Sequence, residues 1–321
     1  MIKISKNIKL SLVVPCYNEQ DNVQLLYSAC KDVFSDKLDN FEVVFVNDGS
    51  RDDTWKELKE LYEKEKNIKL VNFSRNFGKE AAMYAGLQKA VGDYVTIIDA
   101  DLQQRPETVL KMVEFLDNND DFDCVVAYQD ERREGKLLSF YKKCFYKLIN
   151  AVCEIDFRSG ASDFRTFRHN MVESILEMKE YFRFSKGIFS WVGYNVHYMP
   201  YIAEERNAGK TSWSFRKLFK YAMEGILAFT TFPLKLATYA GGICSFLSLL
   251  YMVVVIIQKL AFGIDIPGYP TLIVLILFIG GIQMILLGII GLYISKMYIE
   301  GKRRPIFIAK EYLDSAEKKD D

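Results

Sequence analysis

The chain has 321 residues, half of them hydrophobic, and its 42 Lys and Arg residues balance its 42 Asp and Glu residues. A net charge of zero argues against a nucleic-acid-binding protein, and the hydrophobic content excludes general disorder. The length indicates one large domain plus an appendage. Charged residues are dense up to residue 235 and almost absent from 236 to 295. We therefore expect one soluble part and one part in a membrane.

Five short apolar segments in the first part of the chain are predicted to form buried strands. Helical apolar stripes lie between them, such as Val23, Leu26 and Cys30 after the first segment. Alternating strands and helices are typical of an α/β fold with a mainly parallel sheet. The predicted strands are residues 9–14, 41–46, 68–73, 94–98 and 122–127.

Polar residues follow four of these strands directly. In open α/β sheets the ligand crevice lies outside the carboxyl ends of the strands, so we expect an active site there. The residues are Tyr17, Asn18 and Glu19 after the first strand, Asp48 and Ser50 after the second, Arg75, Asn76 and Lys79 after the third, and Asp99 and Asp101 at the fourth.

Several common sites are disfavoured. The segment after the first strand has no glycine, which argues against a dinucleotide-binding loop. The "GKT" at 209–211 lacks the glycine of a phosphate loop, because Glu204 stands in its place. Two histidines and six cysteines without a CxxC pair argue against a zinc site or a His-based triad, and free thiols are expected.

Asp99 and Asp101 are separated by a single residue at a strand end. Two carboxylates this close repel each other unless positive charge lies between them. A hard divalent cation, Mg²⁺ or Mn²⁺, suits such oxygen ligands and bridges to a diphosphate. The alternative is a helix cap or a solvated acidic turn.

Two uncharged segments near the C-terminus are each long enough to span a bilayer, which takes roughly 20 apolar residues. Pro267 and Pro270 open the second segment, so the predicted spans are residues 236–258 and 271–295. Lysines and arginines follow the second span, and the positive-inside rule therefore places both termini in the cytosol. The N-terminus is too short and too quickly interrupted for a signal peptide. The alternative is a pair of buried helices in a soluble core.

Residues 214–232, just before the first span, have apolar residues at helical spacing, with Arg216, Lys217 and Lys220 off that face. This pattern predicts an interfacial amphipathic helix or a helix packed on the catalytic domain. The predicted organisation is a catalytic domain at 1–212, the amphipathic region at 213–233, a transmembrane hairpin at 234–298 and a cytosolic tail at 299–321.

Several motifs in order resemble family 2 glycosyltransferases with a GT-A domain, and more narrowly the polyprenyl-phosphate sugar synthases. The similarity covers nearly the whole chain, including the two-span tail. One departure is that Gln104 and Arg105 stand where relatives often carry Asp and Pro. The motifs are "VPCYNE" (14–19), "VNDGSRDDT" (46–54), "RNFGKEAAMYAGL" (75–87), "DADLQ" (99–103), "GASDFRTF" (160–167), "RFSKGIFSWVGY" (183–194) and "ERNAGKTSWSFRKL" (205–218).

The resemblance implies roles for individual residues. Asp101 and Gln103, with Asp99 beside them, would hold Mg²⁺ or Mn²⁺ on the diphosphate of a nucleotide-sugar. Asp163 would orient the sugar or the acceptor or act as a base; the alternative is an ion pair with Arg165 or Arg168. The implied nucleotide-sugar contacts are Pro15, Tyr17, Asn18, Glu19, Asp48, Ser50, Lys79 and Asp99. The implied lipid-phosphate contacts are Arg132, Arg133, Arg206 and Lys210, with Arg206 also in a catalytic role.

The predicted function is inverting transfer of a hexose, with glucose favoured, from a UDP-sugar to undecaprenyl phosphate. The enzyme would lie at the cytosolic face of the inner membrane and could form a homo-oligomer. The alternatives are a transferase of the same fold with a hydroxyl acceptor and a non-catalytic membrane scaffold. The sequence lacks the QxxRW segment and additional spans of processive polysaccharide synthases.

Overall fold

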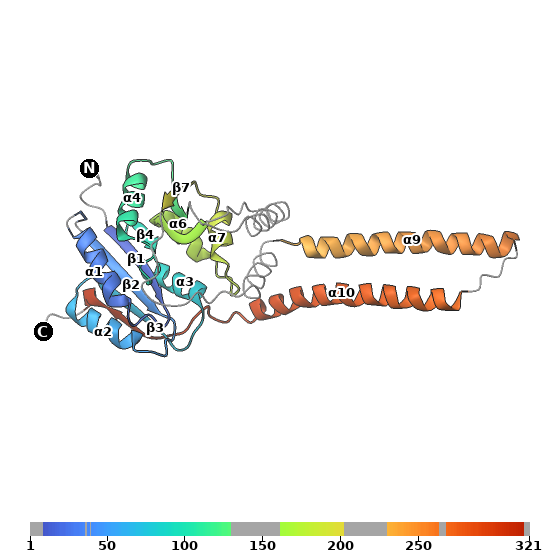
Figure 1. The fold of residues 1–321 in the computed structure, drawn as a ribbon, viewed down its shortest axis with the longest axis horizontal. Helices are drawn as coiled ribbons and strands as arrows, with labels where there is room; N and C mark the ends of the chain where they lie inside the picture. The colour runs from blue at the N-terminus through green and yellow to red at the C-terminus, as the bar shows by residue number, and fades with distance from the viewer. Residues whose placement is uncertain are drawn as a thin grey trace.

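The computed structural model describes residues 9–35, 37–38, 40–129, 161–201, 230–262 and 268–317. An eight-stranded sheet in the order β7-β5-β6-β4-β1-β2-β3-β8 forms its centre (Figure 1). Strands β4, β1, β2 and β3 are mutually parallel, and β5 is parallel to β7. Antiparallel pairs join β6 to β4 and β5, and β8 to β3. The strands are Lys9–Cys16 (β1), Asn40–Asn47 (β2), Ile68–Phe73 (β3), Tyr94–Ile97 (β4), Cys124–Gln129 (β5), Ala161–Arg168 (β6), Val196–Tyr201 (β7) and Ala309–Asp314 (β8).

Helices cover both faces of this sheet because successive residues of a buried strand point to opposite sides. Leu12 and Val14 of β1 pack in the core shared with α1, α2 and α4, whereas Val13 packs with α3, α6 and α7 on the other face. Helix α3 lies close to β1 at Gly86, where a Cβ atom would approach Val13 Cγ1 to 2.2 Å. The helices of this domain are Val23–Phe34 (α1), Thr54–Lys64 (α2), Lys79–Lys89 (α3), Pro106–Asp117 (α4), His169–Glu177 (α6) and Ser185–Trp191 (α7).

The predicted fold class, a mainly parallel sheet with helices followed by two apolar helices, is confirmed. All five predicted strands are present, with ends that differ by a few residues. Strands β6, β7 and β8 were not predicted, and β8 changes the expected organisation. Residues 299–321 were set apart as a tail, but β8 is an edge strand of the eight-stranded sheet and is followed by a short 3-10 helix, Ser315–Glu317.

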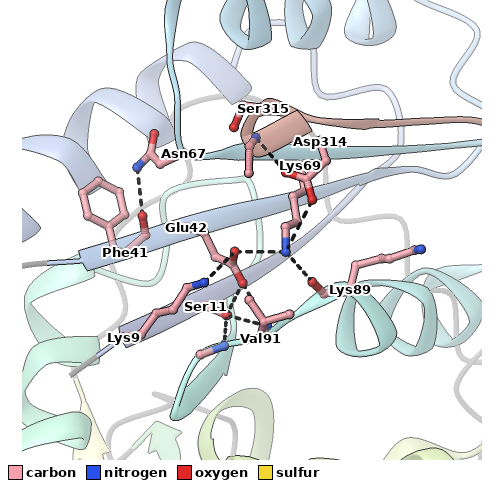
Figure 2. Close-up of polar contacts among 12 residues, drawn as sticks. Lys9, Ser11, Phe41, Glu42, Asn67, Lys69, Lys89, Val91, Asp314 and Ser315 are labelled. Carbon is pink, nitrogen blue, oxygen red and sulfur yellow. Dashed lines mark hydrogen bonds and ion pairs between the residues drawn. The ribbon is translucent and has the colours of Figure 1, made fainter. Parts of the chain in front are cut away.

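A buried polar cluster fastens β8 to the sheet (Figure 2). The Nζ of Lys69 in β3 lies 3.1 Å from Oε2 of Glu42 and 3.8 Å from Oδ2 of Asp314, and it donates to the carbonyl of Lys89 at 3.0 Å. The side chain of Glu42 also accepts from Ser11 Oγ at 2.6 Å. The side chain of Lys69 is only 10% exposed, so its charge depends on these partners.

We expect Lys69→Met to destabilise the protein strongly, because it leaves the buried carboxylates of Glu42 and Asp314 without their shared cation. Removing one member of a buried ion pair costs about 3–5 kcal/mol. Thermal unfolding of the full chain in detergent measures the effect, with the exposed Lys111→Met as a control expected to change stability by less than about 0.5 kcal/mol. Equal melting temperatures for the two variants would show that the cluster does not stabilise the sheet.

Two long apolar helices form a hairpin that projects from the domain (Figure 1). They are Phe232–Phe262 (α9) and Tyr269–Gly301 (α10), each extending beyond the predicted span at both ends. Pro270 is tolerated in the first turn of α10, where its missing N–H has no helical partner to lose. Both contain segments long and apolar enough to cross a membrane, Phe232–Gln258 and Leu272–Gly301, with none of the most apolar window buried in protein. This exposure excludes the alternative of two core helices. Residues 213–229 of the predicted amphipathic region lie outside the described residues.

Candidate active site

A cleft of about 280 Å³ lies at the carboxyl ends of β1, β2 and β4, as the sequence predicted for the site. We refer to it as the strand-end cleft. Loops after four different strands, β1 to β4, contribute to its lining, together with the first turn of α3. Its lining residues include Pro15, Tyr17, Glu19, Asp48, Asn76, Gly78, Lys79, Asp99 and Asp101.

Asn18 and Ser50 join the loops after β1 and β2. The backbone N–H of Asn18 donates to Ser50 Oγ at 3.0 Å, and the Asn18 side-chain oxygen accepts from the N–H of Arg51 at 2.9 Å. Asn18 has a φ of 57°, a left-handed conformation that Asn tolerates better than most residues. These contacts fix the loop shape at the rim of the strand-end cleft.

Asp48 is buried and holds the loop that leads into α3. Its Oδ1 accepts from the N–H of Phe77 at 2.6 Å, and its Oδ2 accepts from the N–H of Gly78 at 3.0 Å. Burial raises the pKa of Asp48, and these two N–H groups oppose the rise. Gly49 permits the close approach of this loop, because a Cβ atom there would lie 2.5 Å from the backbone of Arg75. The carboxylate of Asp48 thus already has backbone partners.

Lys79 bridges two acidic residues that are far apart in the sequence. Its Nζ lies 2.6 Å from Oδ1 of Asp99 and 3.2 Å from Oδ2 of Asp163. Burial works against the charge of Lys79, but the two carboxylates outweigh it and raise its pKa. Burial likewise works against the charge of Asp163, but Lys79, Lys186 and Arg165 together lower its pKa. Lys79 and Asp163 are therefore both ionised at neutral pH.

The ion pair of Asp163 differs from the one weighed in the sequence. Arg165 Nη2 donates to the carbonyl of Ser162 at 2.8 Å, and Arg168 Nη2 lies 3.3 Å from Oδ1 of Asp120. Within the residues that the structure describes, the ion pair of Asp163 is with Lys79. This pairing places Asp163 beside Asp99 and links β6 to the strand-end cleft.

The Asp99–Asp101 segment is shaped by the two glutamines that follow it. Gln104 is buried, accepts from the N–H of Asp99 at 2.9 Å and donates to Asp99 Oδ2 at 3.1 Å. The N–H of Gln103 donates to Asp101 Oδ1 at 3.2 Å. Gln104 therefore orients Asp99. Its position directly after the "DADLQ" motif was the signal in the sequence that could have suggested this role.

The acidic residues of the strand-end cleft fit a divalent cation that is shared with a substrate. Burial raises the pKa of Glu19, and Asp101 and Asp99 raise it further. Across the described ranges, no group of three His, Cys, Asp or Glu residues could form a metal site alone. A cation held by one or two carboxylates, with diphosphate oxygens completing its shell, is the usual arrangement for Mg²⁺.

Four predicted contacts, Arg132, Arg133, Arg206 and Lys210, lie outside the described residues. Conversely, the sequence assigned no role to Tyr181, Arg183 and Lys186, which line a second cleft beside the first. Arg183 and Lys186 belong to the motif "RFSKGIFSWVGY", and Tyr181 lies just before it. The motif was a sign of the family resemblance, but it did not indicate that these residues would lie beside α3.

Comparison with known proteins identifies the class. Residues 11–176 match the family model for glycosyl transferase family 2, and residues 232–297 match the GtrB C-terminal hairpin. The chain belongs to glycosyl transferase family 2 and carries a GtrB-type C-terminal hairpin. The predicted recognition is confirmed.

Several relatives match nearly the whole chain. An uncharacterised glycosyltransferase of Synechocystis sp. is 41% identical, over 95% of this chain and 95% of the relative. A prophage bactoprenol glucosyl transferase homologue of Escherichia coli is 39% identical, over 94% and 99% respectively. The bactoprenol glucosyl transferase of Shigella phage SfV is 39% identical, over 94% and 98%. A solved glucosyl-3-phosphoglycerate synthase from Mycobacterium tuberculosis aligns with a TM-score of 0.48 at 17% identity, over 68% of this chain and 78% of that one.

Proposed function

We propose that this glycosyltransferase moves a hexose, with glucose favoured, from a UDP-sugar to undecaprenyl phosphate at the cytosolic face of the inner membrane. The observation that carries the proposal is the ion-pair bridge from Asp99 through Lys79 to Asp163 at the strand-end cleft. The domain that contains this cleft is joined to two helices long and apolar enough to cross a membrane. Relatives named bactoprenol glucosyl transferase, similar over nearly the whole chain, support the sugar and the lipid.

The leaving group of the proposed reaction is a nucleoside diphosphate. Asp101 and Asp99, with Gln103 beside them, would hold Mg²⁺ or Mn²⁺ on that diphosphate. When bound, the cation stabilises the negative charge that develops on the leaving oxygens. Pro15, Tyr17 and Glu19 at the rim would position the nucleoside, while Asn18, Ser50 and Asp48 keep the rim in shape.

The attacking atom would be a phosphate oxygen of the lipid. A phosphate monoester is largely dianionic at neutral pH, since its second pKa is about 6, so the reaction needs no base to remove a proton. The phosphate oxygen bonds to the anomeric carbon from the face opposite the diphosphate as the bond from that carbon to the diphosphate oxygen breaks. UDP leaves with the bonding electron pair, and a β-linked lipid-phosphate sugar results from an α-linked donor.

Asp163 would then serve as a positioning residue. Its Oδ2 pairs with Lys79, and the lowered pKa of Asp163 makes it a poor proton acceptor. A transferase with a hydroxyl acceptor would need a free base at this place, so the bridge favours a phosphate acceptor. Arg206, with Arg132, Arg133 and Lys210, remains a prediction for holding the lipid phosphate.

The acceptor class is tested with purified full-length protein, labelled UDP-glucose and Mg²⁺, offering undecaprenyl phosphate, undecaprenol or diacylglycerol in separate reactions. We expect label in undecaprenyl phosphate alone, because only it carries an ionised nucleophile. Transfer to undecaprenol or diacylglycerol would favour the hydroxyl-acceptor alternative instead.

Removal of divalent metal should abolish this transfer. We expect EDTA to reduce the rate by at least 100-fold, since loss of one group that stabilises developing charge costs roughly 10²–10³-fold. Excess Mg²⁺ or Mn²⁺ should restore it. A rate that EDTA leaves unchanged would contradict metal binding by Asp99 and Asp101.

A further inference from the structure

A second cleft, of about 530 Å³, adjoins the strand-end cleft and shares Asn76, Gly78 and Lys79 with it. We refer to it as the basic cleft. Its remaining lining comes from the loop before α3 and the first turn of α3, from the segment that leads into α7 and the start of α7, and from Ile306 after α10. Segments distant in the sequence thus meet next to the proposed donor site.

Positive charge dominates the basic cleft. Arg75, Arg183 and Lys186 line it, while its one acidic lining residue among those described, Glu80, accepts hydrogen bonds from the backbone N–H and the hydroxyl of Ser185. The strand-end cleft is the opposite, with four carboxylates and the cation of Lys79. One cleft therefore suits a metal-bound diphosphate, and its neighbour suits an anion that comes without a metal.

In the described part of the chain, Lys79 is ion-paired with two carboxylates, whereas the other cations of the basic cleft, Arg75, Arg183 and Lys186, form no ion pair. Lys186 is half-buried, and although Asp163 favours its charge, burial lowers its pKa. The guanidinium of Arg75 stacks 4.2 Å from the ring centroid of Phe77, and among the described residues it donates only to the carbonyl of Asn76, at 3.4 Å. Arg183 is engaged differently, because it stacks over Tyr84 and donates to the carbonyl of Met178.

The basic cleft also has an apolar side that meets the membrane hairpin. Tyr181 and Phe182 line it together with Ile306. The N–H of Tyr181 donates to a carboxylate oxygen of Glu300 at 3.2 Å, and Lys296 Nζ lies 5.6 Å from the ring centroid of Phe182. Glu300 and Lys296 belong to the last turns of α10, beyond its charge-free segment. The cleft therefore lies where a candidate span ends and a bilayer surface is expected.

We propose that the basic cleft holds the acceptor lipid, with Arg75 and Lys186 binding its phosphate and Tyr181 and Phe182 contacting the first units of its hydrocarbon chain. This inference rests on the proposed function and deepens it. Lys79 lines both clefts and pairs with Asp163, and the two residues would keep the lipid phosphate apart from the donor diphosphate, with the sugar between them. An apolar chain entering from the end of α10 could reach the cleft without leaving the bilayer surface.

The test uses Lys186→Met and Arg75→Met in the full-length protein, with Lys111→Met on the exposed face of α4 as the matched control. We expect each cleft variant to raise the KM for undecaprenyl phosphate roughly 10- to 100-fold, the effect of losing one charge-assisted hydrogen bond. The KM for UDP-glucose should stay within about twofold, and Lys186→Arg should restore most acceptor binding because it keeps the charge. An unchanged acceptor KM, or a raised donor KM instead, would overturn the assignment.

A binding measurement separates this inference from the proposed function. Isothermal titration of the protein with farnesyl phosphate, farnesol and inorganic phosphate needs no turnover. We expect farnesyl phosphate to bind most tightly and to lose affinity in Lys186→Met. Such binding by a protein that transfers no sugar to undecaprenyl phosphate would contradict the proposed function and leave the site standing. Equal binding of farnesyl phosphate by wild type and Lys186→Met would overturn the site, and tightest binding of inorganic phosphate would overturn the lipid as its ligand.

Discussion

Asp101→Asn is expected to abolish sugar transfer while leaving the fold intact. The substitution removes the negative charge from the half-buried residue that faces the strand-end cleft but keeps an oxygen that can accept the N–H of Gln103. Loss of one group that stabilises the leaving diphosphate should lower kcat by roughly 10²–10³-fold. Steady-state rates with UDP-glucose and undecaprenyl phosphate measure the effect.

The matched control for this variant is Asp121→Asn, on the exposed turn before β5. It changes the same charge at a distance from the strand-end cleft, and we expect wild-type rates. Melting temperatures of both variants should stay close to that of the wild type. An Asp101→Asn enzyme that retains full activity would remove the metal-binding role from the Asp99–Asp101 pair.

Lys79→Met is expected to have two effects in opposite directions. It removes the cation that lies between Asp99 and Asp163, so the arrangement of the two carboxylates is lost and transfer should fall by roughly 10²-fold or more. The same change adds net negative charge to the strand-end cleft and frees Asp99 from its ion pair. Mn²⁺ should therefore bind more tightly in the absence of nucleotide, by about tenfold for each 1.4 kcal/mol of added attraction.

Titration with Mn²⁺, followed by electron paramagnetic resonance, gives the metal affinity, and the transfer assay gives the rate. Asp163→Asn is the informative companion, since it removes one negative charge and should weaken Mn²⁺ binding rather than strengthen it. If Lys79→Met lost activity and metal affinity together, Lys79 would be supporting the cleft rather than competing with the metal for Asp99.

Sequence patterns revealed the parallel centre of the fold because its signals are local. Each of β1 to β5 is an apolar segment, and the polar residues that follow four of them reach one sheet edge by the geometry of parallel strands. Asp99 and Asp101 were therefore identifiable from the sequence alone. Their resemblance to a known motif added a chemical role that the spacing alone left open.

The remaining strands depend on contacts that are remote in the sequence. The sequence of β8, "AKEYLD", has the pattern of a charged tail. It forms a strand because it pairs with the edge of β3 and because Asp314 supplies a carboxylate to the buried Lys69. β6 carries buried polar residues, including Thr166, whose hydroxyl pairs with that of Thr96 at 2.7 Å. The two buried phenylalanines of β6, Phe164 and Phe167, are separated by polar residues, so no apolar run marks this strand in the sequence. Its place between β4 and β5 follows only from the tertiary fold.

The same limit applied to the site. The sequence placed Lys79 beside the nucleotide-sugar but gave no sign that it would bridge to Asp163, because α3 and β6 are distant in the chain. The basic cleft could not be predicted from the sequence for the same reason. Arg75 and Lys186 line one cleft only because α7 packs on the sheet face that carries α3.

The measurement that tests the central claim most directly is transfer of label from a panel of radiolabelled nucleotide-sugars to undecaprenyl phosphate by the purified protein with Mg²⁺. The account predicts label in the organic phase from UDP-glucose, lost in Asp101→Asn and retained in Asp121→Asn. Absence of lipid-linked label from every donor, in a protein that still binds nucleotide, would contradict the account.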